Sequence, residues 1–251
     1  MKVVYCSKTD KGKVREHNED AFLNDERFSL FMLADGMGGY QFGDMASKLA
    51  LSVIKSFLEV VASDNGEFSL EMFQKAISLA NKTIYNYKLL NRHIKDTGTT
   101  LVCFLPSGDG GVAFNIGDSR LYVYSKRSLS QITVDHSAEN NLPEFMKGLG
   151  GGKYSGVISR ALGPTKDVEA DEFSFKYQVG DIILLCSDGL YTMVDKQMIE
   201  EILSSNKNLS SKCSSLVETA NKKGGEDNIT VTLVEIISLE GLKVLQMIKQ
   251  D

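Results

Sequence analysis

Acidic residues stand at the ends of apolar, strand-like runs at four places in this chain, and this placement restricts how the chain can fold. The four segments cover residues 15–20, 35–39, 187–189 and 226–228, and a fifth acid lies in the turn at 117–120. Several carboxylates placed where strands end indicate one shared site for a divalent cation, because Mg²⁺ and Mn²⁺ prefer oxygen ligands. Such a site favours metal-activated water that attacks an electrophile, above all a phosphate ester.

Hydrophobic periodicity predicts runs of antiparallel strands and pairs of helices, which is α+β organisation rather than regular βαβ alternation. The predicted strands cover residues 3–6, 21–23, 28–34, 99–105, 111–116, 120–124, 172–177, 181–186 and 229–236, and those between 99 and 124 read as a meander. The predicted helices cover 43–61 (ended by a turn at 63–66), 70–90, 196–203 and 210–222, with weaker helical segments at 142–147 and 241–251. No linker or repeat divides the chain, which predicts one domain over residues 1–251.

The bulk composition is that of an ordinary globular protein, with 251 residues, 42% hydrophobic and 24% charged. The net charge of −5, without a basic block, argues against nucleic-acid binding. The four cysteines (Cys6, Cys103, Cys186 and Cys213) form no C-x-x-C pair, which excludes a zinc ribbon and suits a reducing compartment. No signal peptide or membrane span is recognisable, so we expect a cytoplasmic protein that does not bind membranes.

Asp35 and Asp188 share one local pattern: an apolar strand, a small residue, Asp, then Gly. Either one alone reads as a β-turn. Glycine also lets the backbone approach an ion and offer its carbonyl as a ligand. Together with Asp227 and Glu19, the two Asp-Gly pairs favour the metal-site interpretation, with Asp227 beside the end of the 181–186 strand.

The segment R-x-x-N-E-D at 15–20 places a guanidinium near two carboxylates. The segment forms either a weak surface ion pair or a site in which Arg15 binds a substrate phosphate beside the metal ligands. The turn at 117–120 reads by itself as a plain hairpin turn. The glycine-rich stretch 148–153 lacks P-loop spacing, no G-x-S-x-G elbow occurs, and the C-x5-R loop of cysteine phosphatases is missing.

With these pieces in order, the chain resembles the metal-dependent serine/threonine protein phosphatases of the type 2C (PPM) family, in their bacterial form. The resemblance extends from about residue 5 to 236. The matching segments are R-x-x-N-E-D at 15–20, D-G-M-G-G at 35–39, T-G-T-T at 97–100, G-D-S-R at 117–120, D-H-S at 135–137, R-A-L-G at 160–163, G-D at 180–181 leading into C-S-D-G-L at 186–190, and E-D-N-I-T at 226–230.

The resemblance implies a four-layer αββα sandwich, two antiparallel sheets flanked by pairs of helices, with the metal site at one end. It implies two Mn²⁺ or Mg²⁺ ions and a third, weaker cation. The implied ligands are Glu19, Asp35, the Gly36 carbonyl, Asp118, Asp188 and Asp227. Asp35 would bridge two ions, Asp188 and Asp227 would complete the first site, and Glu19 would support the second. Asp118 with Asp188 would hold the third ion.

The implied catalytic set is Arg15 as the phosphate-binding residue, Asp35 and Asp188 at the metals, and Asp20 just behind them. Residues 136–160 would form a mobile flap near the active site. Met37 stands where many eukaryotic members carry His, so no side chain at that position can serve as a general acid. Bacterial members commonly share this feature.

The leading hypothesis is an active phosphatase that acts on phosphorylated Ser/Thr proteins, shares its substrates with a Ser/Thr kinase, and works as a monomer. A catalytically inactive PPM-fold binding module is the alternative from a different class. A missing carboxylate or Arg would favour it, but Arg15, Asp35, Asp188 and Asp227 are all present. A third reading is a different phosphoester hydrolase on this scaffold, such as one serving an anti-sigma-factor antagonist, and substrate profiling separates it from the first.

Overall fold

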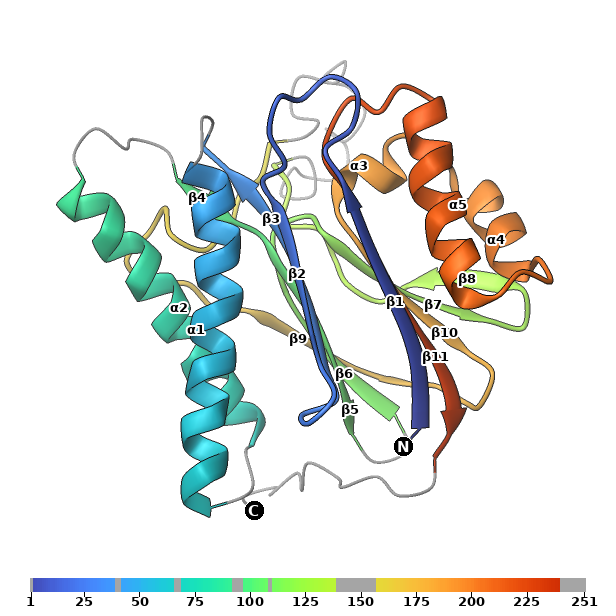
Figure 1. Cartoon of the computed structure of the whole chain (residues 1–251). Coiled ribbons are helices and arrows are strands. Elements are labelled where there is room, and N and C mark those ends of the chain that lie inside the picture. Colours follow the sequence, from blue (N-terminus) through green and yellow to red (C-terminus); the bar gives the residue numbers. More distant parts are fainter. Residues whose placement is uncertain are drawn as a thin grey trace, which may run out of the picture.

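Two antiparallel β-sheets lie face to face, and helices cover both outer faces (Figure 1). This is the predicted α+β sandwich. The computed structural model describes residues 2–38, 42–65, 69–91, 97–107, 110–138 and 157–239. The weak helical predictions at 142–147 and 241–251 lie outside these residues, as does most of the predicted flap. No helix in these ranges is both long and apolar enough to cross a membrane.

Each sheet takes strands from both halves of the chain. The first has the order β1 (Lys2–Asp10), β11 (Ile229–Ser238), β10 (Ile182–Cys186), β7 (Arg120–Ser125), β8 (Ser128–Gln131). The second has the order β2 (Asp20–Asp25), β3 (Leu30–Met37), β5 (Leu101–Ser107), β6 (Gly110–Ile116), β9 (Asp171–Lys176), with β4 (Gly98–Thr99) beside β3. The helices α1 (Phe42–Asn65) and α2 (Leu70–Leu90) cover the second sheet, and α3 (Asp188–Tyr191), α4 (Lys196–Ser204) and α5 (Leu209–Lys222) cover the first (Figure 1).

The central strands are buried on both sides, which explains why their sequences are continuously apolar. In β3, Phe31 and Leu33 pack between the sheets, whereas Leu30 and Met32 pack toward α1 and α2. Successive strand side chains point to opposite faces, so one apolar run supplies two cores. Burying these runs between sheets and helices is the main favourable term in folding this chain.

Helix starts follow recognisable caps. Ser69 accepts a hydrogen bond from the Met72 N–H at the start of α2, and Asp195 and Asn208 do the same for α4 and α5. The predicted bounds of the 70–90 helix are confirmed. The predicted end of the first helix is wrong, because α1 continues through Asn65.

The predicted meander over 99–124 is wrong in its last step. β5 and β6 pair as expected, but β7 pairs with β10 and β8 in the other sheet. The chain changes sheets at Gly117, whose φ of +101° is a backbone conformation that favours glycine. The strand β8 and the short helix α3 were not predicted, since four residues carry little periodicity.

All four cysteines are unpaired, and three of them are buried: Cys103, Cys186 and Cys213. Burial raises the pKa of each of these three thiols.

Candidate metal centre

The sheets bring the predicted acids to one end of the sandwich, the upper end in Figure 1. Asp20 and Asp35 are directly opposite each other where β2 begins and β3 ends. Thr99 and Thr100 fix the Asp35 backbone, because the Thr99 hydroxyl and the Thr100 N–H donate to its carbonyl at 2.9 and 2.8 Å. The Asp35 N–H in turn donates to Thr100 Oγ1 at 2.9 Å. The residue predicted to bridge two ions is therefore held at its main chain.

Asp20 ties the second sheet to the first. One of its carboxylate oxygens accepts from Ser187 Oγ at 2.8 Å and from Thr230 Oγ1 at 2.6 Å. Ser187 precedes Asp188, and Thr230 lies at the start of β11. Burial raises the pKa of Asp20 to about 7, the two hydroxyl bonds lower it, and the charges of Asp188 and Asp227 raise it further.

Asp188 and Asp227 are neighbours because Gly189 allows close packing. A Cβ at Gly189 would lie 2.1 Å from the Asn228 carbonyl oxygen, so only glycine fits between α3 and the start of β11. The prediction that Asp227 lies beside the end of the 181–186 strand is consistent with this packing. Asp227 Oδ2 pairs with Arg15 Nη2 at 2.7 Å.

Glu19 lies against Gly36, near the end of β3. Its carbonyl accepts from the Gly36 N–H at 3.2 Å and from Ser47 Oγ at 2.6 Å. Its carboxylate passes over Gly43, where a Cβ would lie 2.5 Å from Glu19 Oε2. The structure thus places Glu19 beside Gly36, as a shared metal site requires.

Asn228 also organises this end of the sandwich, although its sequence position predicts no role for it. Its side chain donates to the carbonyls of Lys11 and His17 at 2.9 and 2.8 Å and accepts from the Glu19 N–H at 2.8 Å. These three bonds hold the loop that carries Arg15 against β11. The only sequence signal for these contacts was the position of Asn228 in the 226–230 segment, because its partners lie about 210 residues away along the chain.

The pKa is raised for each of four carboxyl groups in this region, those of Asp20, Asp35, Asp118 and Asp188. Burial is the largest cause for each, and repulsion from neighbouring Asp carboxylates raises the pKa of each further; the values reach about 7 for Asp118 and about 6 for Asp188. Asp35 is shifted in the same direction. Of the described residues, Asp20, Asp118 and Asp188 each have one buried carboxylate oxygen without a hydrogen-bond partner. Buried, crowded and partly unpaired carboxylates need positive charge, and a divalent cation with oxygen ligands fits them.

Within the described ranges, no three His, Cys, Asp or Glu side chains already stand at the spacing of metal ligands. Asp227 is engaged by Arg15, and Glu19 lies over Gly43. An ion held by both Asp227 and Glu19 would need the two carboxylates to leave these contacts.

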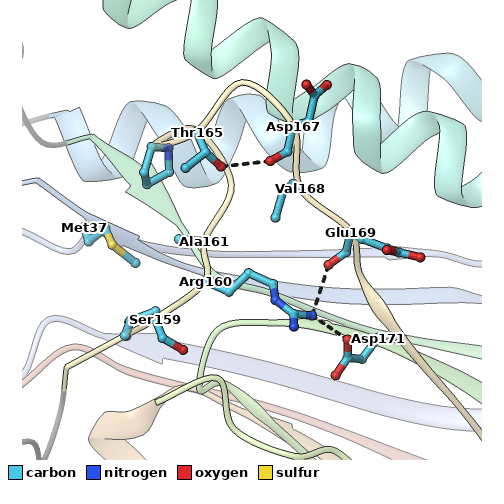
Figure 2. A pocket seen from close by; sticks show the side chains of 11 residues that line it. Met37, Ser159, Arg160, Ala161, Thr165, Asp167, Val168, Glu169 and Asp171 are labelled. Carbon is cyan, nitrogen blue, oxygen red and sulfur yellow. Dashed lines mark hydrogen bonds and ion pairs between the residues drawn. The ribbon is translucent and has the colours of Figure 1, made fainter. Parts of the chain in front are cut away.

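A cavity of about 410 Å³ opens beside Met37, the last residue of β3 (Figure 2). Its other side is the segment that leads into β9, where Arg160 forms an ion pair with Asp171 and donates to the Glu169 carbonyl at 3.3 Å. The remaining lining residues are Ile158, Ser159, Ala161, Pro164, Thr165, Asp167 and Val168. The cavity adjoins the metal centre and is partly apolar.

Carboxylates that need cations, gathered at one end of an αββα sandwich, define the class of divalent-cation-dependent phosphoester hydrolases. Residues 11–233 match the family described as protein phosphatase 2C, and the chain belongs to this family. It is a metal-dependent protein serine/threonine phosphatase of the bacterial type.

Similar proteins agree with this assignment. The serine/threonine phosphatase stp of Listeria monocytogenes is 38% identical over 242 residues, covering 91% of this chain and 94% of the relative. The serine/threonine phosphatase PstP/Ppp of Mycobacterium tuberculosis has a crystal structure that is 30% identical, with a TM-score of 0.81 over 94% of this chain and 99% of its own. A structure of the PstP catalytic domain in complex with two manganese ions has a TM-score of 0.79, 30% identity and the same coverage.

Proposed function

We propose that this serine/threonine phosphatase binds two Mn²⁺ or Mg²⁺ ions and a third, weaker one. The ligands we assign are those implied by the sequence: Glu19, Asp35, the Gly36 carbonyl, Asp118, Asp188 and Asp227. The observation that carries the proposal is the set of buried, unpaired carboxylate oxygens on Asp20, Asp118 and Asp188. The two manganese ions of the PstP complex support the count. When bound, such ions activate water and offset charge on the phosphoryl oxygens.

Arg15 is the proposed phosphate-binding residue. Its side chain is 55% exposed, so an incoming phosphate can reach it, and its guanidinium can donate two parallel bonds to phosphate oxygens. Asp227 holds Arg15 at the mouth of the site. Binding of Asp227 to a cation would free the guanidinium for the substrate, so the two roles are compatible.

Asp20 has a supporting part in this proposal. Both of its hydroxyl partners, Ser187 and Thr230, are buried, and Asp20 itself is 4% exposed, which keeps it away from the substrate. It orients the Ser187–Asp188 turn. Met37 cannot donate a proton, so no side chain at that position protonates the departing Ser or Thr oxygen.

The substrates are phosphorylated proteins, and we propose that the cavity beside Met37 receives residues next to the phosphorylated one. A Ser/Thr kinase that shares these substrates is the proposed partner. We further propose that residues 1–251 act as one monomeric phosphatase unit. The four free cysteines support a cytoplasmic location.

The decisive experiment measures phosphate release from a phosphothreonine peptide with Mn²⁺, with Mg²⁺ and with excess chelator. We expect turnover with either cation, none with chelator, and a loss of at least about 100-fold in Asp188→Asn. Glu201→Gln, which removes an exposed acid on α4, is the matched control and keeps full activity. Undiminished activity in Asp188→Asn would refute the assigned site. No turnover with any cation from folded protein would support the binding-module alternative.

A further inference from the structure

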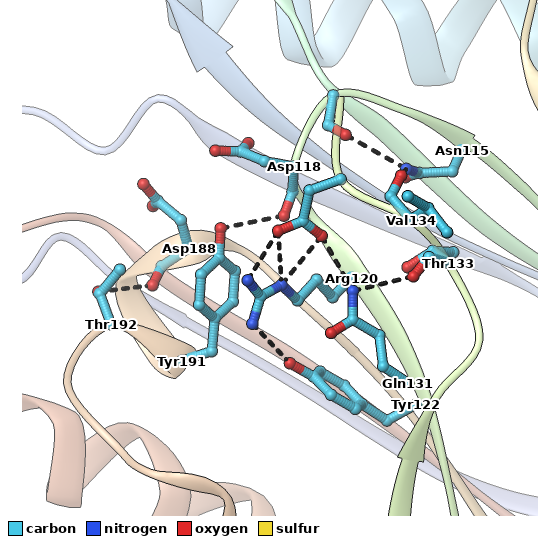
Figure 3. Close-up of polar contacts among 12 residues, drawn as sticks. Asn115, Asp118, Arg120, Tyr122, Gln131, Thr133, Val134, Asp188, Tyr191 and Thr192 are labelled. Carbon is cyan, nitrogen blue, oxygen red and sulfur yellow. Dashed lines mark hydrogen bonds and ion pairs between the residues drawn. The ribbon is translucent and has the colours of Figure 1, made fainter. Parts of the chain in front are cut away.

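Tyr191 joins the two turns that carry Asp118 and Asp188. The helix α3 begins at Asp188 and ends at Tyr191, and the Tyr191 hydroxyl donates to the Asp118 backbone carbonyl at 3.1 Å (Figure 3). Asp118 lies between β6 and β7, 73 residues before Tyr191 in the chain. In Figure 3 both carboxylates point to the same side of this link. One hydrogen bond therefore ties α3, which begins at Asp188, to the backbone of Asp118.

The Tyr191 ring is itself fixed. The guanidinium carbon of Arg120 lies 3.5 Å from the ring centroid, a close cation–π contact. Arg120 is held in turn by three contacts to the Asp135 carboxylate at 2.7–3.0 Å, and it donates to the Tyr122 hydroxyl at 3.0 Å. Because these contacts fix the Tyr191 ring, they also fix the direction in which its hydroxyl points toward the Asp118 carbonyl.

The opposite flank of the Asp118 turn is held by His136. Its N–H donates to the Gly117 carbonyl at 2.8 Å, and its Nδ1 accepts from the Gly117 N–H at 3.0 Å. A Cβ at Gly117 would lie 2.6 Å from Thr100 Cγ2. The main chain before Asp118 is therefore immobilised as well, while its carboxylate oxygen Oδ1 is buried without a partner. The arrangement fixes the backbone and leaves the ligand oxygen available.

We infer that Tyr191 is a positioning residue that sets the distance between Asp118 and Asp188 and thereby the affinity of the weak cation site between them. This inference rests on the proposed third ion. Tyr191 does not touch an ion or the substrate; it acts through the Asp118 main chain. Loss of its hydroxyl removes the bond between the Asp118 carbonyl and α3, while His136 still holds Gly117 and the Asp35 backbone keeps its own bonds to Thr99 and Thr100.

The test is a Mn²⁺ titration of the full chain, in which electron paramagnetic resonance measures the free ion and thermal unfolding checks the fold. Four proteins are compared: wild type, Asp118→Asn, Tyr191→Phe and Tyr122→Phe. Tyr122→Phe is the matched control, because it removes a phenol hydroxyl from the same Arg120 cluster without touching Asp118. We expect Asp118→Asn to lose the weakest Mn²⁺ and Tyr191→Phe to bind it about tenfold more weakly, with the tighter ions unchanged. Tyr122→Phe should match wild type.

Three other outcomes would each refute either the third cation site or the positioning role of Tyr191. If Asp118→Asn binds as many ions as wild type, the proposed third site is wrong, and the role of Tyr191 falls with it. If Asp118→Asn loses an ion but Tyr191→Phe does not weaken its binding, the third site stands and the positioning role is refuted. Equal weakening in Tyr191→Phe and Tyr122→Phe would also refute it, because packing of the cluster rather than the bond to Asp118 would then set the affinity.

Discussion

In the proposed site, Arg15 has two partners, Asp227 and the substrate phosphate. Its guanidinium rests on Asp227 at the open mouth of the site, and both side chains remain partly exposed, at 55% and 31%. An exposed pair of this kind adds at most about 1 kcal/mol to stability. The role proposed for Arg15 is therefore recognition, because a planar fork of donors matches a phosphate better than an ammonium does.

Replacing Arg15 by Lys should lower kcat/KM for a phosphothreonine peptide by about tenfold or more, because the charge remains but the two parallel bonds are lost. Steady-state kinetics at saturating Mn²⁺ provide the measurement. The control is Arg27→Lys in the turn between β2 and β3, which should behave as wild type. Equal kinetics for Arg15→Lys and wild type would exclude bidentate phosphate binding by Arg15.

At the scale of elements, the metal centre is a junction between the two sheets. Asp20 at the start of β2 accepts from groups at the end of β10 and the start of β11, and Ser187 Oγ also accepts from the Thr230 N–H at 2.9 Å. The cavity beside Met37 is formed where β3 meets the segment entering β9. Strand ends thus position the carboxylates, and one connecting segment shapes the adjoining surface.

Thr230→Val should lower the free energy of unfolding in chelator by about 1–3 kcal/mol, because a buried carboxylate loses a donor. Urea unfolding at pH 8 measures this. The control is Thr232→Val on the same strand. It removes a hydrogen bond between two neutral hydroxyls, Thr232 Oγ1 and Ser7 Oγ, which are 2.8 Å apart. It should lose only about 1 kcal/mol. A smaller loss at Thr230 than at Thr232 would contradict the junction described above.

Thr165→Trp should obstruct the cavity beside Met37. We expect a several-fold rise in KM for a phosphopeptide and no change for p-nitrophenyl phosphate, which has no flanking residues to place. Lys166→Trp is the control, since Lys166 is exposed and does not line the cavity. A parallel loss on both substrates would indicate damage to the metal centre instead of a peptide-binding surface.

For the molecule as a whole, the buried acids oppose folding when no cation is bound. In the native state Asp118 keeps its proton up to about pH 7, whereas an unfolded Asp releases it near pH 4. Between these values the native state binds more protons than the unfolded state, so its stability falls as pH rises. Above about pH 7 both states are ionised and this loss is complete.

The corresponding prediction compares wild type with Asp118→Asn in excess chelator from pH 4.5 to 8. The stability difference should shift in favour of Asp118→Asn by up to about 1.4 kcal/mol per pH unit until about pH 7, and then level off. Chemical unfolding at each pH provides the data. Parallel stability curves for the two proteins would show that Asp118 is not perturbed in the native state.

Much of this organisation could be predicted from local sequence. The 70–90 helix had a cap and a long apolar face, and the acids that follow apolar runs are brought by the strands to one end of the sandwich. The change of sheet at β7 could not be predicted, because strands buried on both faces show no alternation that assigns them to a sheet. The contacts of Asn228 and Tyr191 join residues about 210 and 73 positions apart, and no local pattern encodes such pairs.

The placement of the thiols has a consequence for oxidative stress. Phosphatases that attack with a cysteine thiolate lose activity when peroxide converts that sulfur to sulfenic acid. In the proposed mechanism the attacking group is water, and Cys103, Cys186 and Cys213 are buried thiols whose raised pKa keeps them in the unreactive protonated form. Under that mechanism, peroxide that inactivates thiolate-dependent phosphatases would leave dephosphorylation of phosphoserine and phosphothreonine by this protein intact.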